Sequence, residues 1–194
     1  MVLSRVSYSV EPQSRGVVNS NPIILFPTEV EAAPFCRLAP DSEVVISGVG
    51  MAATTATLAR LQREGRLDRD RCIILAGVAG SYHDSVAVED VVEVVEERCA
   101  ELPARFCRSY RATARLTALR GVISNTVHRG VDDGGGAQIE NMEGAALFAF
   151  ADAMELRATE LRAVSNRVGE SFEAWHLAEA TEALAQRLVT ILKS

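Results

Sequence analysis

The stretch "EVVISGVGMAATTATLARLQREGRLDRDRCIILAGVAG" (43–80) decides the fold class. "EVVISGVG" (43–50) is a short apolar run typical of a buried strand, and "MAATTATLARLQREG" (51–65) after it has a helical pattern. "CIILAGVAG" (72–80) is a further apolar run that ends in small residues. Strands alternating with helices indicate an α/β fold with a largely parallel central sheet.

The same alternation continues along the chain. We therefore expect a three-layer α/β sandwich around a central mixed, mostly parallel sheet. In "VVEVVEE" (91–97) valines and glutamates alternate, so one face of that strand should be exposed. Further apolar runs predict strands, and helical patterns predict helices, at these places: strands 23–26, 121–126 and 161–166, and helices 142–156 and 173–192.

Length and composition restrict the domain organisation. A chain of 194 residues suits one domain with a sizeable core. Residues 1–22 are polar and unpatterned, and we expect a poorly ordered N-terminal extension there. Residues 23–194 are predicted to form a single domain.

Charge and cysteine spacing argue against several classes of partner. A formal net charge of -6 makes nucleic acid an improbable partner. No apolar run approaches the ~20 residues that a membrane helix needs. The four cysteines and three histidines are not spaced as zinc ligands, so we expect no metal. Without a signal peptide, a cytoplasmic protein with reduced, buried thiols is the expectation.

"GVGMAA" (48–53) matches the GxGxxA spacing of dinucleotide-binding turns. That function needs an acid at the end of the next strand, and "LAGVAG" has none. Two strands that end in small residues should instead leave a hollow at their carboxyl ends, where open α/β sheets bind ligands. Gly50, Ala79 and Gly80 are candidates for its lining.

Two glutamates follow the first strand. Glu29 and Glu31 lie in "PTEVEAAPF" (27–35), at the same predicted edge of the sheet. Acids at a helix N-terminus commonly interact with the helix dipole, so a structural role competes with a catalytic one.

Glu143 begins the helical pattern of "IENMEGAALFAFADAM" (139–154), on the same stripe as Leu147 and Phe150. A dipole role with Asn141 as N-cap is one interpretation. A carboxylate that faces the core needs hydrogen-bond partners, however, and the hydroxyls of a ligand at the mouth of a pocket would supply them.

The segment "RAVSNRVGE" (162–170) ends a strand in Ser165 and Asn166, which also favour turns. If the sheet is parallel there, the strand ends share one rim and form a neutral, hydroxyl-binding pocket with two carboxylates and no metal. The residues on this rim are Glu31, Gly48, Gly50, Ala79, Gly80, Glu143, Ser165 and Asn166.

The order of these motifs is familiar. "PTEVEAAPF", "VVISGVGMAATTATLARL", "ILAGVAGSY", "IENMEGAALFAF" and "LRAVSNRV" resemble the nucleoside phosphorylase and nucleosidase superfamily over residues 23–192. The pattern "SNRVGE" followed by a tryptophan is most similar to the futalosine hydrolase subgroup. The resemblance implies cofactor-free hydrolysis of futalosine, a purine nucleoside, to hypoxanthine and dehypoxanthinyl futalosine in menaquinone biosynthesis.

The resemblance also implies roles for individual residues. Glu31 matches the glutamate that activates water. Glu143 and Met142 match the pair that binds the ribose, the carboxylate accepting from its hydroxyls and the methionine packing beneath it. Asn166, oriented by Ser165, stands where adenine-specific nucleosidases carry an aspartate. An amide offers both a donor and an acceptor, which suits a 6-oxopurine.

Alternatives remain open at this point. They are a methylthioadenosine/adenosylhomocysteine nucleosidase, a purine nucleoside phosphorylase and a non-catalytic nucleoside-binding homologue. Hydrolysis is favoured because Arg37 is the only basic residue close in sequence to the first strand. The resemblance further implies a homodimer whose subunits complete each other's pocket, and Phe106 and Tyr110 are candidates for the contributing loop.

Overall fold

The computed structural model describes residues 21–130 and 133–193. In this part of the chain, one mixed sheet is covered by four α-helices and a short 3-10 helix. The first strand begins at Ile23, where the predicted domain begins. The predicted extension, residues 1–22, lies almost wholly outside the described residues and stays a prediction.

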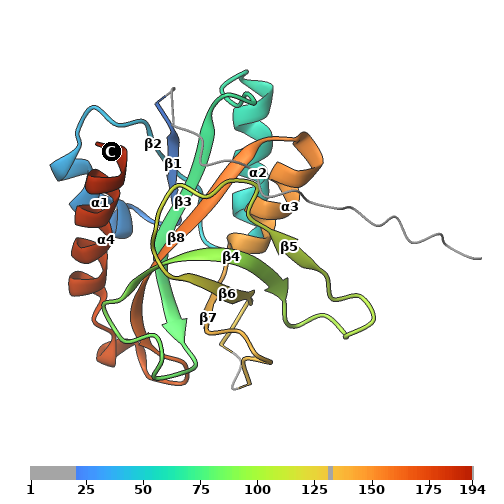
Figure 1. Ribbon diagram of the computed structural model, residues 1–194, viewed down its shortest axis with the longest axis vertical. Helices are drawn as coiled ribbons and strands as arrows, with labels where there is room; N and C mark the ends of the chain where they lie inside the picture. Colours follow the sequence, from blue (N-terminus) through green and yellow to red (C-terminus); the bar gives the residue numbers. More distant parts are fainter. Residues whose placement is uncertain (1–20, 131–132, 194) are drawn as a thin grey trace, which may run out of the picture.

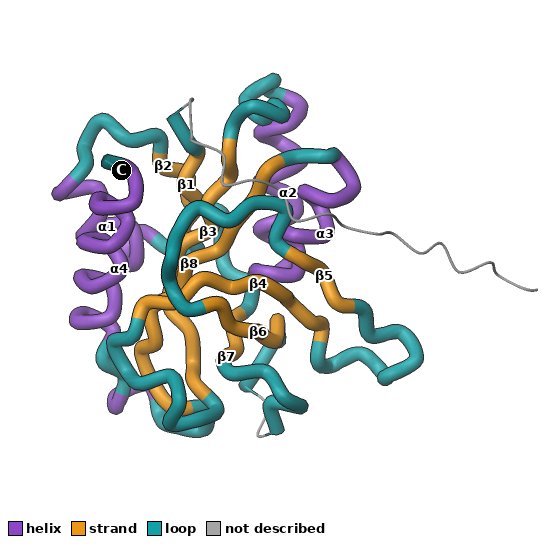
Figure 2. The backbone as a smooth tube through the Cα atoms, viewed as in Figure 1, coloured by secondary structure: helices purple, strands orange, loops and turns teal. Residues whose placement is uncertain are grey.

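Eight strands form the sheet (Figure 2). Five of their pairings are parallel and three are antiparallel, which confirms the mixed, mostly parallel prediction. The strand order is β2-β1-β3-β7-β6-β4-β5, and β8 pairs with both β3 and β4. The strands are β1 (Ile23–Phe26), β2 (Val44–Ile46), β3 (Cys72–Ser81), β4 (Val91–Cys99), β5 (Ser109–Arg111), β6 (Gly121–Thr126), β7 (Ile139–Asn141) and β8 (Arg157–Arg167).

Helices cover the sheet on two sides, as the three-layer prediction requires (Figure 1). α1 packs with α4 on one side, and α2 packs with α3 on the other. Each pair closes over its own apolar cluster, the first containing Phe35 and Leu184 and the second Leu58 and Leu147. The helices are α1 (Glu29–Leu38), α2 (Met51–Arg63), α3 (Gly144–Met154), α4 (Leu177–Leu192) and the 3-10 helix Phe172–Ala174.

Two short strands, β5 and β7, are not predicted by the sequence, and residues 139–141 were expected to lead into a helix. Three residues carry too little periodicity to identify a strand. β7 exists because β6 pairs with it on one side and β3 on the other, and both partners are distant in sequence. As a result α3 begins at Gly144, two residues later than predicted.

The prediction that β4 exposes its acidic face is wrong. Glu93 and Glu97 are both fully buried. The physical reason is the closure of the sheet, because β4 pairs with β6 and β8 and also packs against α3 and α4. Glu93 accepts hydrogen bonds from the side chains of Arg115, Thr117 and Thr159.

The cysteines differ from the expectation that all are buried. All four are free thiols, and Cys36 is exposed whereas Cys72 is buried. Burial raises the pKa of the Cys72 thiol to about 12, so it is unreactive at neutral pH. No helix within residues 21–130 and 133–193 is long and apolar enough to cross a membrane.

Candidate active site

Glu31 is held at the N-terminus of α1 and turned toward β3. Thr28 caps the helix, since its Oγ1 accepts from the Glu31 backbone N–H at 3.2 Å and donates to Glu31 Oε2 at 2.6 Å. Glu31 Oε1 accepts from the Val78 backbone N–H at 3.0 Å. Glu29, which lies earlier in the same helix turn, is exposed. Glu29 therefore faces solvent at the helix N-terminus, whereas Glu31 faces the ends of the strands.

Glu143 is buried, with 3% of its surface exposed, and the protein itself supplies its partners. Its Oε1 accepts from the Gly50 backbone N–H at 2.9 Å, and its Oε2 accepts from Arg162 Nη2 at 3.1 Å. The expectation of a carboxylate at an open pocket mouth is thus not met. The predicted core stripe is confirmed at Leu147, which is buried, and at Phe150, which packs against the core, but Met154 at its end is 40% exposed.

Asn141 fixes the start of α3. Its Oδ1 accepts from the backbone N–H groups of Glu143 and Gly144, both at 2.8 Å. The backbone position of the N-cap belongs to Glu143, so Asn141 provides the predicted capping oxygen from two residues earlier. Its Nδ2 donates to Glu97 Oε1 and to Ser124 Oγ, which sets the orientation of the amide.

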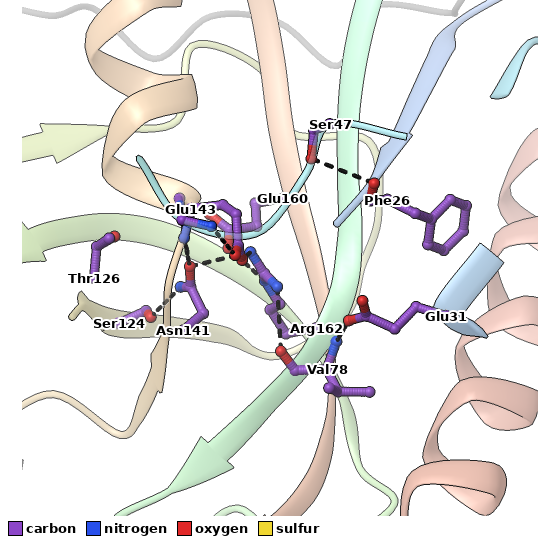
Figure 3. A network of polar contacts seen from close by, with 12 residues as sticks. Phe26, Glu31, Ser47, Val78, Ser124, Thr126, Asn141, Glu143, Glu160 and Arg162 are labelled. Carbon is purple, nitrogen blue, oxygen red and sulfur yellow. Dashed lines mark hydrogen bonds and ion pairs between the residues drawn. The ribbon is translucent and has the colours of Figure 1, made fainter. Parts of the chain in front are cut away.

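Arg162 on β8 is the centre of this network (Figure 3). Its Nε donates to Glu160 Oε1 at 2.7 Å, and Nη1 donates to the Val78 carbonyl at 3.1 Å. Nη2 donates to Asn141 Oδ1 at 3.0 Å and to Glu143 Oε2. Burial opposes the charge on Arg162, but the Glu160 and Glu143 carboxylates raise its pKa above the ordinary value. The guanidinium is therefore a permanent buried cation.

Sequence reasoning missed Arg162, although "LRAVSN" was identified as a strand. The available signal was an arginine inside an otherwise apolar run, since a buried charge requires paired partners. Arg37, the basic residue considered instead, is exposed and paired with Glu182 at 3.2 Å. The prediction of a neutral rim is wrong for the same reason, because a buried cation lies among its carboxylates.

Gly77 on β3 makes the approach of Glu31 and Arg162 possible. A Cβ at this position would lie 2.6 Å from Arg162 Nη1 and 3.0 Å from Glu31 Oε1. β7 runs antiparallel to the end of β3, so the chain after it returns toward Gly77 and carries Glu143 to the same guanidinium. Glu143 therefore binds Arg162 directly, and Glu31 lies near the same guanidinium across Gly77 without a hydrogen bond to it.

Ser165 and Asn166 form a second group at the end of β8. Ser165 Oγ donates to Asn166 Oδ1 at 2.8 Å, and Asn166 Nδ2 donates to the Arg167 carbonyl at 2.8 Å. The register shifts here, so that Asn166 lies opposite Gly80. Asn166 lies four positions after Arg162 in β8, or about 13 Å along the strand. The structure therefore places both carboxylates near Arg162, and it places the Asn166 amide farther along β8.

The other predicted lining residues lie beside one or other of these two groups. Gly50 adopts a φ of 89°, a conformation that side chains disfavour, and its N–H reaches Glu143. Ala79 is buried and its carbonyl lies 3.5 Å from Ser165 Oγ. Met142 is half-buried immediately before Glu143.

The two aromatic residues predicted for a partner-facing loop have different surroundings. Phe106 is 58% exposed, and the Arg105 guanidinium lies 4.7 Å from its ring centroid. Tyr110 lies in β5 and packs against the apolar core, so it is not a loop residue. The homodimer stays a prediction.

The candidate carboxylates are buried and hydrogen-bonded within the protein. Surface hollows of about 460 and 240 Å³ lie elsewhere, one beside α4 and one at the end of α3. Among the residues that the structure describes, no three His, Cys, Asp or Glu side chains are grouped to hold a metal ion.

Replacing Gly144 with alanine should destabilise the protein, although glycine-to-alanine changes within helices normally stabilise by about 1 kcal/mol. A Cβ on Gly144 would overlap Glu97 Oε1 and Glu160 Oε2, both buried. We expect a loss of about 1–3 kcal/mol in the free energy of unfolding, measured in urea. A stabilised variant would show that this contact is absent in solution.

The comparisons with known proteins agree with the predicted fold. No protein-family model and no curated protein matches the chain. Among solved structures, a Helicobacter pylori methylthioadenosine/adenosylhomocysteine nucleosidase mutant with 5′-methylthioadenosine in its active site matches at 16% identity and a TM-score of 0.76, covering 90% of this chain and 99% of that one. The Colwellia psychrerythraea nucleosidase in complex with adenine matches at 18% identity and a TM-score of 0.74, covering 89% of this chain and 94% of that one.

A futalosine hydrolase of Helicobacter pylori matches at 14% identity and a TM-score of 0.74, covering 88% of this chain and 96% of that one. All three likenesses extend over nearly the whole of both chains. The chain therefore has the fold of the nucleoside phosphorylase and nucleosidase superfamily, which its motifs resemble.

Proposed function

We propose that this protein hydrolyses the N-glycosidic bond of a purine nucleoside, with futalosine as the favoured substrate. The observation that carries the proposal is the placement of Glu31 and Glu143 around the buried Arg162. Solved structures of this fold include nucleosidases and a futalosine hydrolase, which supports the same chemistry here.

Glu143 is the proposed ribose-binding group. Cleavage of the bond places positive charge on the sugar, and a nearby carboxylate stabilises that charge most strongly where water is excluded. A carboxylate has about four acceptor positions. Gly50 and Arg162 occupy two of them, which leaves positions for ribose hydroxyls.

Glu31 is the proposed general base. Val78 and Thr28 each donate to one of its oxygens, so both oxygens are oriented and each keeps a free lone pair. A water bound there would lose its proton to Glu31 as it attacks the sugar.

Asn166 is the proposed contact to the base. Ser165 donates to Asn166 Oδ1 and Asn166 Nδ2 donates to the Arg167 carbonyl, so the amide is held in one orientation and one of its two N–H groups is left for a ligand. A donor beside an acceptor suits the edge of a 6-oxopurine, and futalosine carries hypoxanthine. Adenine nucleosides such as methylthioadenosine are the competing substrates.

Hydrolysis is favoured over phosphorolysis by the state of Arg162. Four of the five N–H donors of a guanidinium are occupied here, by Glu160, Val78, Asn141 and Glu143. Little of the buried cation is left to bind a phosphate co-substrate.

The direct test is to incubate the protein with futalosine, inosine and methylthioadenosine, with and without phosphate, and to follow free base by chromatography. We expect hypoxanthine from futalosine at a rate that does not depend on phosphate. Ribose 1-phosphate among the products would establish phosphorolysis. Absence of free base from all three nucleosides would leave only nucleoside binding.

Replacing Glu31 with glutamine should lower kcat by about 10²–10⁴-fold, because an amide cannot accept the proton from water. The amide oxygen can still accept from Val78 and its nitrogen can donate to Thr28, so the fold should persist. The matched control is Glu29→Gln in the same helix turn, where the side chain is exposed. Equal losses in both variants would remove Glu31 from the mechanism.

A further inference from the structure

Two buried glutamates beneath the N-terminus of α3 have no part in the mechanism above. Glu97 and Glu160 are both fully buried. Glu97 accepts from Asn141 Nδ2 at 2.5 Å and from Thr126 Oγ1 at 2.7 Å, and Glu160 Oε1 accepts from Arg162 Nε. Glu160 Oε2 is buried and has no hydrogen-bond donor among the described residues.

Glu160 Oε2, the oxygen without a donor, lies close to Glu97. A Cβ on Gly144 would overlap both Glu160 Oε2 and Glu97 Oε1, so these oxygens border the same small space. Two ionised carboxylates there would repel, and Oε2 would be a buried acceptor without a donor. One proton between them removes both problems by forming a short O–H···O bond.

The electrostatic surroundings agree. Burial raises the pKa of Glu97 well above its ordinary value, and the charge of Glu160 raises it further. Burial also raises the pKa of Glu160, while Arg162 opposes that change. The charged groups that face the pair are Arg162 from β8 and Glu143 from the start of α3.

The geometry points to a shared proton between Glu97 and Glu160, and to the pair as a positioning unit for Arg162 in the proposed reaction. Glu160 holds Nε of the guanidinium directly. Glu97 holds Asn141, whose Oδ1 accepts from Nη2. Both arms of the pair therefore end on the group that holds Glu143.

Loss of the shared proton adds a second negative charge beside Arg162, and this charge competes with Glu143 for the guanidinium. The unfolded chain loses this proton near the ordinary glutamate pKa of about 4.3, whereas the folded chain keeps it. Above that pH the folded state binds more protons, so stability falls as pH rises, until the pair itself ionises.

Glu160→Gln tests the shared proton. The amide oxygen can accept from Arg162 Nε, and the amide nitrogen can donate to an ionised Glu97 Oε1, so this variant keeps every bond and the single negative charge of the pair without the shared proton. Urea unfolding between pH 4 and pH 9 should show a smaller loss of stability with rising pH than in the natural chain. Parallel profiles would overturn the shared proton.

Glu97→Gln is the matched variant. An amide nitrogen at the Oε1 position would face the Nδ2 donor of Asn141, and the flipped amide would set an oxygen against Glu160 Oε2. We therefore expect it to be less stable than Glu160→Gln at every pH. The reverse order would overturn the arrangement of donors and acceptors.

The positioning role rests on the proposed function and is read from the pH dependence of kcat/KM for futalosine. We expect Glu160→Gln to shift the alkaline limb to higher pH. If Glu160→Gln flattens the pH dependence of stability but leaves the pH dependence of kcat/KM unchanged, the positioning role is wrong and the shared proton stands. If no nucleoside is cleaved, the proposed function fails. The unfolding profiles still show whether Glu97 and Glu160 share a proton.

Discussion

Replacing Arg162 with methionine is expected to lower the free energy of unfolding by about 3–5 kcal/mol, the usual cost of removing one partner of a buried ion pair. The side chain is 1% exposed, and its loss leaves the carboxylates of Glu143 and Glu160 without their cation. The carbonyl of Val78 and the amide oxygen of Asn141 lose a donor as well. Urea unfolding at pH 7 measures the effect.

The control is Arg37→Met, the same change at an exposed arginine. Arg37 pairs with Glu182 on the surface, and such pairs contribute about 0–1 kcal/mol. Similar losses in the two variants would mean that the buried network around Arg162 contributes nothing beyond an ordinary surface pair.

Replacing Glu143 with glutamine should lower kcat/KM for the purine nucleoside by about 10²–10³-fold, because a neutral amide cannot stabilise the positive charge on the sugar. The structure adds a second effect. Gly50 N–H and Arg162 Nη2 each donate to one carboxylate oxygen, and an amide can accept only one of these bonds. We therefore also expect a loss of about 1–3 kcal/mol in stability.

Release of free base and urea unfolding measure the two effects separately. The matched control is Glu155→Gln at the other end of α3, where the side chain is 69% exposed and paired with Arg69. Full activity in Glu143→Gln would contradict the ribose-binding role, whatever the change in stability.

Local sequence was sufficient for most elements of the fold. β6 has the predicted bounds, 121–126, because its apolar run is bounded by a glycine and polar residues. The start of α1 is also local, since Thr28 caps the helix and acids occupy its first turn, although no cap was predicted there. The Ser165–Asn166 hydrogen bond is equally local.

The features that were not predicted depend on contacts between segments that are distant in the sequence. β7 is too short to have a pattern of its own and is formed by pairing with β3 and β6. The glutamates of β4 alternate with valines as surface residues do, yet closure of the sheet buries Glu93 and Glu97.

By itself, the sequence determined the α/β alternation and the superfamily likeness, because propensities and motifs act over a few residues. Only the tertiary structure decided that Glu143 meets Arg162 and Gly50, and that Glu97 faces Glu160. A buried charge is tolerable only where partners converge on it, and these partners come from β4, β7, β8 and the turn before α2.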